Sequence, residues 1–205
     1  MRGEIKICGL TRIEDARAAF DAGADYLGFV FFPGSKRAVT PAAARTILAG
    51  LPAEARAVGV FVNELPARVE QVAREVGLRA VQLHGDEEPS AFRGFSIPIW
   101  RAVRWEGGRW APDPAEWPAE RWLIDACAPG HYGGTGRTAD WEAAADWAAE
   151  RPVFLAGGLT PATVAEAIRR VRPAGVDVSG GVERAPGCKD EMKIRDFIRA
   201  ARAAW

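Results

Sequence analysis

Polar side chains recur at alternate positions near the ends of several short apolar runs. They are Lys6 and Cys8 in "EIKIC", Gln82 and His84 in "AVQLH", Asp125 in "WLID", and Asp177 and Ser179 in "GVDVS". Side chains on a strand alternate between two faces, so each pair lies on one face. An unpartnered buried polar group costs ~1 to 3 kcal/mol, which packing alone does not favour. Together these residues predict a pocket able to exchange protons, and Arg101 in "IWRAV" is a further candidate for it.

Cys8 has two interpretations. A cysteine packs well as a small buried residue, which would make it core filling. At the exposed end of a strand its thiolate could instead act on a ligand. A free thiol with a pKa of ~8.5 is mostly protonated at neutral pH, so the second role needs a nearby cation. Lys6, two residues earlier on the same face, is the candidate.

The elements that carry these residues follow a regular order. Short β-branched or aromatic runs alternate with amphipathic stretches, from "EIKICG" and "IEDARAAFDAGA" to "GVDVSGG" and "KDEMKIRDFIRAARAAW". This pattern predicts eight strand–helix units, of which the fifth helix, around "APDPAEWPAE", is the weakest and is expected to be short or irregular. We expect an α/β fold, a (β/α)8 TIM barrel of parallel strands in a single domain over residues 1–205. A doubly wound open sheet is the alternative, but "CGLTRIED" is not the glycine-rich fingerprint that such a sheet usually carries after its first strand.

Loops at the carboxyl ends of barrel strands form the active site. Two adjacent loops carry glycine pairs, Gly157–Gly158 in "LAGGLTP" and Gly180–Gly181 in "VSGGVE", and loops after strands seven and eight commonly bind phosphate in this fold. Arg37 in "GSKRAVTP" follows the second strand and could bind a carboxylate through two hydrogen bonds. The "GTG" at 134–136 predicts either a mobile loop over the pocket or a merely flexible connection.

Composition narrows the classes of partner. Lysine plus arginine and aspartate plus glutamate number 27 each, which gives no global attraction to nucleic acid or an acidic membrane. The cysteines, Cys8, Cys127 and Cys188, form no CxxC pair, so we expect neither disulfides nor a metal site and a cytoplasmic location. We also expect no leader and no membrane span. The tryptophan-rich surface helices, with Trp141, Trp147 and the terminal Trp205, could form a homodimer interface or simply part of the outer ring.

An ordered set of motifs resembles phosphoribosylanthranilate isomerase, a family of tryptophan biosynthesis. The motifs are "KICGLT", "GFVFFPGSKRAVTP", "VGVFVN", "VQLHGDE", "LIDA", "GGTG", "LAGGL" and "GVDVSGGVE" with "PGCKD". The resemblance spans nearly the whole chain and implies a (β/α)8 barrel. It also implies an Amadori rearrangement of N-(5'-phosphoribosyl)anthranilate, a small phosphorylated substrate, without metal or organic cofactor.

The resemblance assigns roles to individual residues. Cys8 matches the general base, Asp125 the general acid and Arg37 the ligand of the anthranilate carboxylate. Phosphate binding falls to Gly157, Gly158, Gly180 and Gly181, while Gln82, His84, Asp177 and Ser179 would orient hydroxyl groups or the phosphate. As a general acid, Asp125 must keep its proton well above the usual ~3.9, with burial against Leu123 as the expected cause. The chain departs from the usual "DVSSGVE" at Gly180, where one serine hydroxyl is missing.

Two other classes stay open at this stage. Another phosphate-binding barrel of the same pathway or of histidine biosynthesis would carry a carboxylate base where this chain has Cys8, and an aldolase-type barrel would need a lysine at the reacting centre. A barrel that binds a phosphorylated ligand without turnover is the second alternative. The joint presence of Cys8, Asp125 and Arg37 favours the isomerase.

Overall fold

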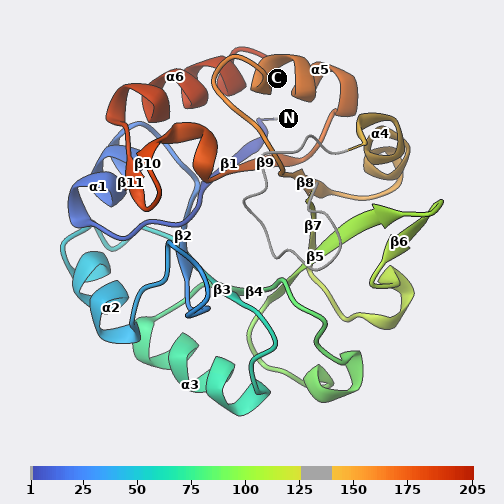
Figure 1. Ribbon diagram of the computed structural model, residues 1–205, viewed down its shortest axis with the longest axis horizontal. Coiled ribbons are helices and arrows are strands. Elements are labelled where there is room, and N and C mark those ends of the chain that lie inside the picture. The colour runs from blue at the N-terminus through green and yellow to red at the C-terminus, as the bar shows by residue number, and fades with distance from the viewer. Residues whose placement is uncertain (1, 126–139) are drawn as a thin grey trace.

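Eight parallel strands close into a ring in the computed structural model, which describes residues 2–125 and 140–205 (Figure 1). They are β1 (Glu4–Ile7), β2 (Tyr26–Val30), β3 (Ala57–Phe61), β4 (Ala80–Leu83), β5 (Ile99–Glu106), β7 (Arg121–Ile124), β8 (Val153–Leu155) and β9 (Gly175–Val178). Strand order follows β4-β3-β2-β1-β9-β8-β7-β5, and pairing of β4 with β5 closes the barrel. This confirms the predicted TIM barrel.

Helices surround the ring and cover its outer face (Figure 1). They are α1 (Ile13–Asp21), α2 (Pro41–Ala49), α3 (Pro66–Val76), α4 (Trp141–Glu150), α5 (Val164–Val171) and α6 (Glu191–Arg202). Each buries one stripe toward the strands. In α3 the stripe contains Val69, Val72 and Val76, at the spacing of a helix face, and Gly77 ends the helix with a φ of 77°.

One of the eight predicted helices is wrong, and the fifth is irregular, as the sequence predicts. Between β4 and β5 the chain forms only the 3-10 turn η1 (Pro89–Phe92). After β5 it turns back as the antiparallel strand β6 (Arg109–Ala111), followed by the 3-10 turn η2 (Pro114–Glu116). Prolines at 112, 114 and 118 remove backbone donors from this segment, so no regular helix can form there.

The core has two layers. Inside the ring lie Tyr26, Val58, Ala80, Trp100, Ala102, Leu123, Phe154 and Ala156. Aromatic rings fill this interior, since Trp100 lies 4.8 Å from both Tyr26 and Phe154 between ring centroids. A larger apolar layer lies between the strands and the helices. The polar side chains at the carboxyl ends of the strands therefore lie next to a layer of aromatic rings inside the barrel.

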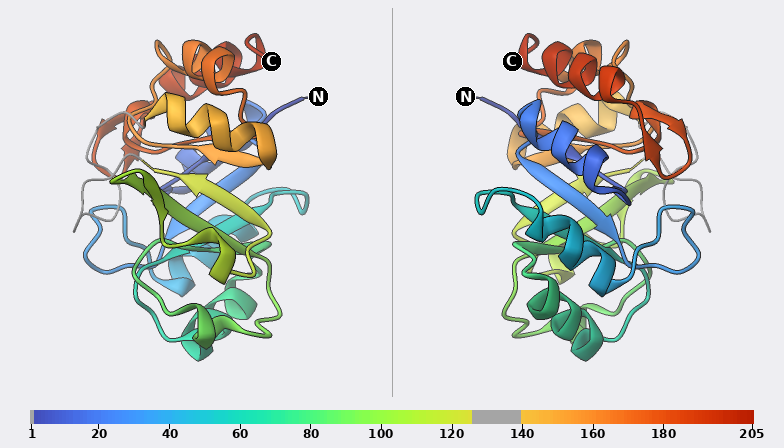
Figure 2. Two further views of the ribbon diagram at one scale, coloured as in Figure 1. Left: turned by 90° about the vertical axis from the view of Figure 1, so that its right-hand side faces the viewer. Right: turned by 90° about the vertical axis from the view of Figure 1, so that its left-hand side faces the viewer.

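Extra elements gather at the carboxyl end of the strands. The turn η3 (Gly180–Val182) leads from β9 into a hairpin of β10 (Glu183–Ala185) and β11 (Cys188–Lys189). Figure 2 shows this hairpin at the same end of the barrel as the loop after β2. None of the helices within residues 2–125 and 140–205 has the length and apolar character needed to cross a membrane.

Candidate active site

A chain of hydrogen-bonded polar side chains crosses the inside of the barrel at the carboxyl ends of its strands. Lys6 Nζ donates to Asp177 Oδ1 over 2.9 Å and to Gln82 Oε1 over 3.0 Å. Gln82 Nε2 lies 2.9 Å from His84 Nδ1, and His84 Nε2 lies 3.0 Å from Asp125 Oδ2. All five side chains are buried. Four strands and their ends thus supply one continuous network of proton donors and acceptors.

Cys8 stands at the Lys6 end of this network and is also buried. Burial raises the pKa of the Cys8 thiol, and the nearby charge and hydrogen bond of Lys6 lower it by less, so the pKa is raised overall. Burial alone would lower the pKa of Lys6, but the charges and hydrogen bonds of Asp177 and Cys8 together raise it by more, and the lysine stays protonated. Lys6 therefore supplies the expected cation, although the thiol remains protonated in the free protein.

A second cluster of charges lies where the loop after β2 meets the β10–β11 hairpin. Arg37 donates from Nε and Nη2 to the two oxygens of Glu183, over 2.8 and 2.7 Å. Lys189 Nζ lies 2.8 Å from Glu183 Oε1, 3.1 Å from the carbonyl oxygen of Ser179 and 3.4 Å from its Oγ. Burial lowers the pKa of Lys189, and Glu183 opposes this only in part. The cluster places two cations around one carboxylate.

The loops after β8 and β9, which carry the two glycine pairs, approach each other closely. Gly157 and Gly158 adopt positive φ angles of 82° and 66°. A Cβ on Gly181 would come 1.9 Å from the carbonyl oxygen of Leu159, so only glycine allows the two loops to approach this closely. On Gly180 a Cβ would come 3.3 Å from Arg37 Nη2. Glycine backbone of the loop after β9 therefore lies beside Arg37 on one side and contacts the loop after β8 on the other.

Comparison with known proteins identifies the family. The family model described as N-(5'phosphoribosyl)anthranilate (PRA) isomerase matches residues 5–200. The chain belongs to this family. It is 48% identical to the N-(5'-phosphoribosyl)anthranilate isomerase of Pelobacter propionicus over 199 residues, which cover 97% of this chain and 95% of that one.

Two solved structures of the family have the same fold. One is a monomeric form of the dimeric isomerase of Thermotoga maritima, with a TM-score of 0.82 and 40% identity over 98% of this chain and 99% of that one. The other was solved in complex with reduced 1-(o-carboxyphenylamino)-1-deoxyribulose 5-phosphate. It has a TM-score of 0.82 and 38% identity, again over 98% and 99% of the two chains.

Most of the site residues predicted from the sequence lie together in the structure, but Arg101 lies apart from them. Arg101 is buried on the outer side of the barrel, because its neighbours Trp100 and Ala102 both belong to the interior cluster. Its assignment to the interior set is therefore wrong. The predicted glycine loop at 134–136 and Cys127 lie outside the described residues.

Sequence reasoning missed Glu183 and Lys189. Both come from the hairpin after β9, and the distance in sequence from Arg37 to Glu183 is 146 residues. The motifs "GVE" and "PGCKD" contain them, and an acidic and a basic residue flanking a glycine-rich loop were the available signal. Hairpin pairing brings the two side chains to the same point, and strand periodicity does not predict such pairing.

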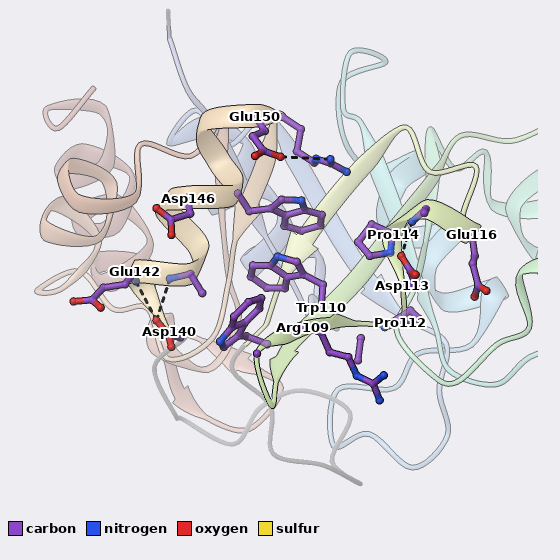
Figure 3. A pocket seen from close by; sticks show the side chains of 17 residues that line it. Arg109, Trp110, Pro112, Asp113, Pro114, Glu116, Asp140, Glu142, Asp146 and Glu150 are labelled. Atoms are coloured by element: carbon purple, nitrogen blue, oxygen red, sulfur yellow. Dashed lines mark hydrogen bonds and ion pairs between the residues drawn. The ribbon is translucent and has the colours of Figure 1, made fainter.

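A groove among the described residues lies away from this site. Its volume is about 1140 Å³, and it lies between α4 and the segment formed by β6 and η2 (Figure 3). Trp110 of β6 stacks on Trp147 of α4 with ring centroids 4.5 Å apart. The groove thus occupies the place of the missing fifth helix, and the proton-transfer groups of the barrel do not line it.

Proposed function

We propose that this chain converts N-(5'-phosphoribosyl)anthranilate to 1-(2-carboxyphenylamino)-1-deoxyribulose 5-phosphate. One observation carries the proposal: a buried thiol, Cys8, and a buried carboxyl group, Asp125, stand at opposite ends of one hydrogen-bonded network inside the barrel mouth. An aldose-to-ketose rearrangement needs a base and an acid held in fixed relation. Membership of the isomerase family supplies the substrate.

The substrate has two anionic groups, and two features of the site suit them. The glycines of the paired loops, Gly157, Gly158, Gly180 and Gly181, would hold the phosphate with backbone N–H groups, with Ser179 beside them. Arg37 would bind the anthranilate carboxylate through its guanidinium. Its pKa is raised by the hydrogen bonds to Glu183, so it stays charged.

The first step is opening of the ribose ring. Asp125, protonated, donates to the ring oxygen while the C1–O bond breaks and the anthranilate nitrogen forms a protonated imine with C1. His84 holds Oδ2 of this carboxyl group at 3.0 Å and so orients the donor. The developing positive charge on the nitrogen makes the hydrogen on C2 acidic, which prepares the second step.

The second step is removal of that C2 proton by the Cys8 thiolate. The resulting enolamine then takes up a proton at C1 from the Cys8 thiol and gives its C2 hydroxyl proton to the Asp125 carboxylate. This yields the ketone and restores both groups, so the overall reaction is an isomerisation by proton transfer alone. Because burial raises the pKa of Cys8, the thiolate is scarce in the free protein. The protonated imine would add a positive charge beside the sulfur and shift the thiol toward its ionised form. Asp177 acts through Lys6, and Gln82 through His84.

The test is a fluorescence assay on freshly prepared N-(5'-phosphoribosyl)anthranilate, in buffer with a chelator and no added cofactor. Wild-type protein should consume the substrate. Cys8→Ser and Asp125→Asn should each lower kcat by about three orders of magnitude or more, with substrate binding retained. Binding without turnover by the wild type would reject the isomerase. Normal turnover by Cys8→Ser would show that the Cys8 thiol only fills space in the core and is not the base.

The remaining features of the proposal concern the whole chain. Residues 1–205 would act as one barrel domain in the cytoplasm, where the free thiols Cys8 and Cys188 stay reduced. We propose a homodimer by analogy with the isomerase of Thermotoga maritima, which is described as dimeric. Sedimentation at several protein concentrations tests the dimer, and a constant monomer mass would reject it.

A further inference from the structure

Arg101 is a buried cation that the proposed chemistry does not use. Its side chain is only 1% exposed and lies on the outer face of β5, so it cannot touch a ligand inside the barrel. Removing a guanidinium from water is costly unless hydrogen-bonding partners compensate for the lost hydration. A cation retained at such a position points to a specific arrangement of those partners.

The partners of Arg101 flank one residue of the site. Its Nη1 donates to the carbonyl oxygen of Leu83 over 2.6 Å, and its Nη2 donates to that of Gly85 over 2.7 Å. Between them in the chain lies His84. The planar fork of an arginine can hold two carbonyl groups at a fixed spacing, which a lysine ammonium cannot reproduce. Arg101 therefore clamps the main chain on both sides of His84.

A second set of contacts fixes the turn beyond His84. Glu87 lies 3.3 Å from Arg101 Nη1 and accepts hydrogen bonds from the backbone N–H of Gly85 and of Asn63, over 3.0 and 2.9 Å. A Cβ on Gly85 would come 2.3 Å from Asn63 Oδ1, so the approach requires glycine. The ring of Trp117 covers the guanidinium at 4.4 Å. The carboxyl end of β4 is thus held from several directions.

The hydrogen-bond network also assigns the tautomer of His84. Lys6 has only donors, so the Gln82 oxygen faces it and the Gln82 amide NH2 faces His84 Nδ1. Nδ1 must then accept, and in a neutral imidazole the proton is on Nε2, which donates to Asp125 Oδ2. His84 thus holds Oδ2 of Asp125 through a donated hydrogen bond.

We propose that Arg101 is a positioning residue for proton transfer: it fixes the backbone around His84 so that Nε2 of the imidazole holds Asp125 in donating geometry. The inference rests on the proposed role of Asp125 as general acid. Arg101 touches neither the substrate nor Asp125. Its effect passes through the two carbonyl groups and the imidazole, and should therefore appear in the chemical step more than in binding.

Steady-state kinetics give the first test. Arg101→Lys keeps the charge and loses the fork, and we expect kcat to fall about 10- to 100-fold while KM changes less than about threefold. The double variant Arg101→Met/Glu87→Gln removes both charges of the buried pair, which avoids an uncompensated carboxylate, and it should show the same split. Arg121→Met is the matched control, since Arg121 pairs with Glu4 and lies over Trp100 at the opposite end of the barrel. It should lower the Tm with kcat unchanged.

Nitrogen NMR of protein labelled in histidine gives a test that does not depend on turnover. The chain has two histidines, His84 and His131, and His84→Gln assigns the signals. In the wild type, Nδ1 of His84 should be unprotonated and Nε2 protonated, and Arg101→Lys should give a mixture of tautomers. An unchanged His84 signal in Arg101→Lys, or an unchanged kcat, would overturn the proposal. An inactive wild type would reject the isomerase, and the NMR result would then decide the clamp alone.

Discussion

The carboxylate of Glu183 binds one edge of the Arg37 guanidinium through two hydrogen bonds of 2.8 and 2.7 Å. Burial would raise the pKa of Glu183, but the hydrogen bonds from Arg37 and Lys189 lower it below its usual range. The glutamate is therefore ionised at neutral pH. Because the pair uses only the Nε and Nη2 side of the fork, the Nη1 side can bind a second carboxylate. Glu183 thus holds Arg37 ready for the substrate.

Glu183→Gln tests this holding role. The amide keeps the size of the side chain but cannot accept two charged hydrogen bonds, so Arg37 loses its fixed orientation. We expect KM to rise about tenfold with kcat within about threefold of wild type. Glu191→Gln, which disrupts the exposed ion pair with Arg195 on α6, is the control and should leave both constants unchanged. A wild-type KM in Glu183→Gln would show that Arg37 needs no such support.

Titration of the Cys8 thiol tests the electrostatics of the proposed base. Since burial raises its pKa more than Lys6 lowers it, the thiol should ionise above the ~8.5 of a free cysteine. The ultraviolet absorbance of the thiolate, taken as wild type minus Cys8→Ser, isolates this residue from the other cysteines. Likewise, kcat/KM should keep rising as the pH passes through the usual thiol range, because the free enzyme must lose that proton. Ionisation of Cys8 below neutral pH would contradict the burial argument.

Gly28→Ala tests how closely β2 passes the thiol. A Cβ at this position would lie 2.7 Å from Cys8 Sγ and 2.9 Å from Cys8 Cα, so the strand carrying the base must shift. We expect kcat to fall about tenfold or more, together with a lower Tm. Gly59→Ala is the matched control, because its Cβ would meet Leu78 at 2.4 Å on the outer face of β3. That variant should lower the Tm and keep kcat. Equal kcat values for the two variants would contradict a local effect on Cys8.

The strand pattern of the sequence predicts the barrel and its polar network well, for a physical reason. Alternation places Lys6 with Cys8 and Gln82 with His84 on one face, and parallel strands bring their carboxyl ends to one mouth. Periodicity does not determine which face points inward when both faces are buried. In "IWRAV" the side chain of Trp100 points into the barrel and that of Arg101 points to the outer layer. The prediction that Arg101 lies inside the barrel is wrong for this reason.

Strand periodicity does not predict the contacts that hairpins and turns make. Lys189 reaches Glu183 because β10 and β11 pair, and Glu183 reaches Arg37 across most of the chain. The irregular fourth and fifth helices have the same origin, since prolines and short turns replace periodic structure there. Family motifs mark these segments without showing what each side chain touches.

Gly181→Ala tests whether contact between the last two strand loops forms the phosphate site. The added methyl group would lie 1.9 Å from the carbonyl oxygen of Leu159 and 3.2 Å from Thr160 Cα, so the two loops must move apart. Backbone N–H groups from both loops would then no longer converge on one anion. We expect KM to rise about tenfold or more, and inhibition by inorganic phosphate to weaken to a similar extent.

The neighbouring glycine provides the control for that experiment. In Gly180→Ala the methyl group would meet Arg37 Nη2 at 3.3 Å, a contact that a shift of a few tenths of an ångström relieves while the pair with Glu183 is kept. KM should therefore change less than about threefold, and the phosphate inhibition constant should stay near that of wild type. Comparable losses in both variants would mean that loop contact at Gly181 has no special part in binding. A loss confined to Gly181→Ala would locate the phosphate between the loops after β8 and β9. It would also show that the site needs glycine at 181, because any larger side chain there would push the two loops apart.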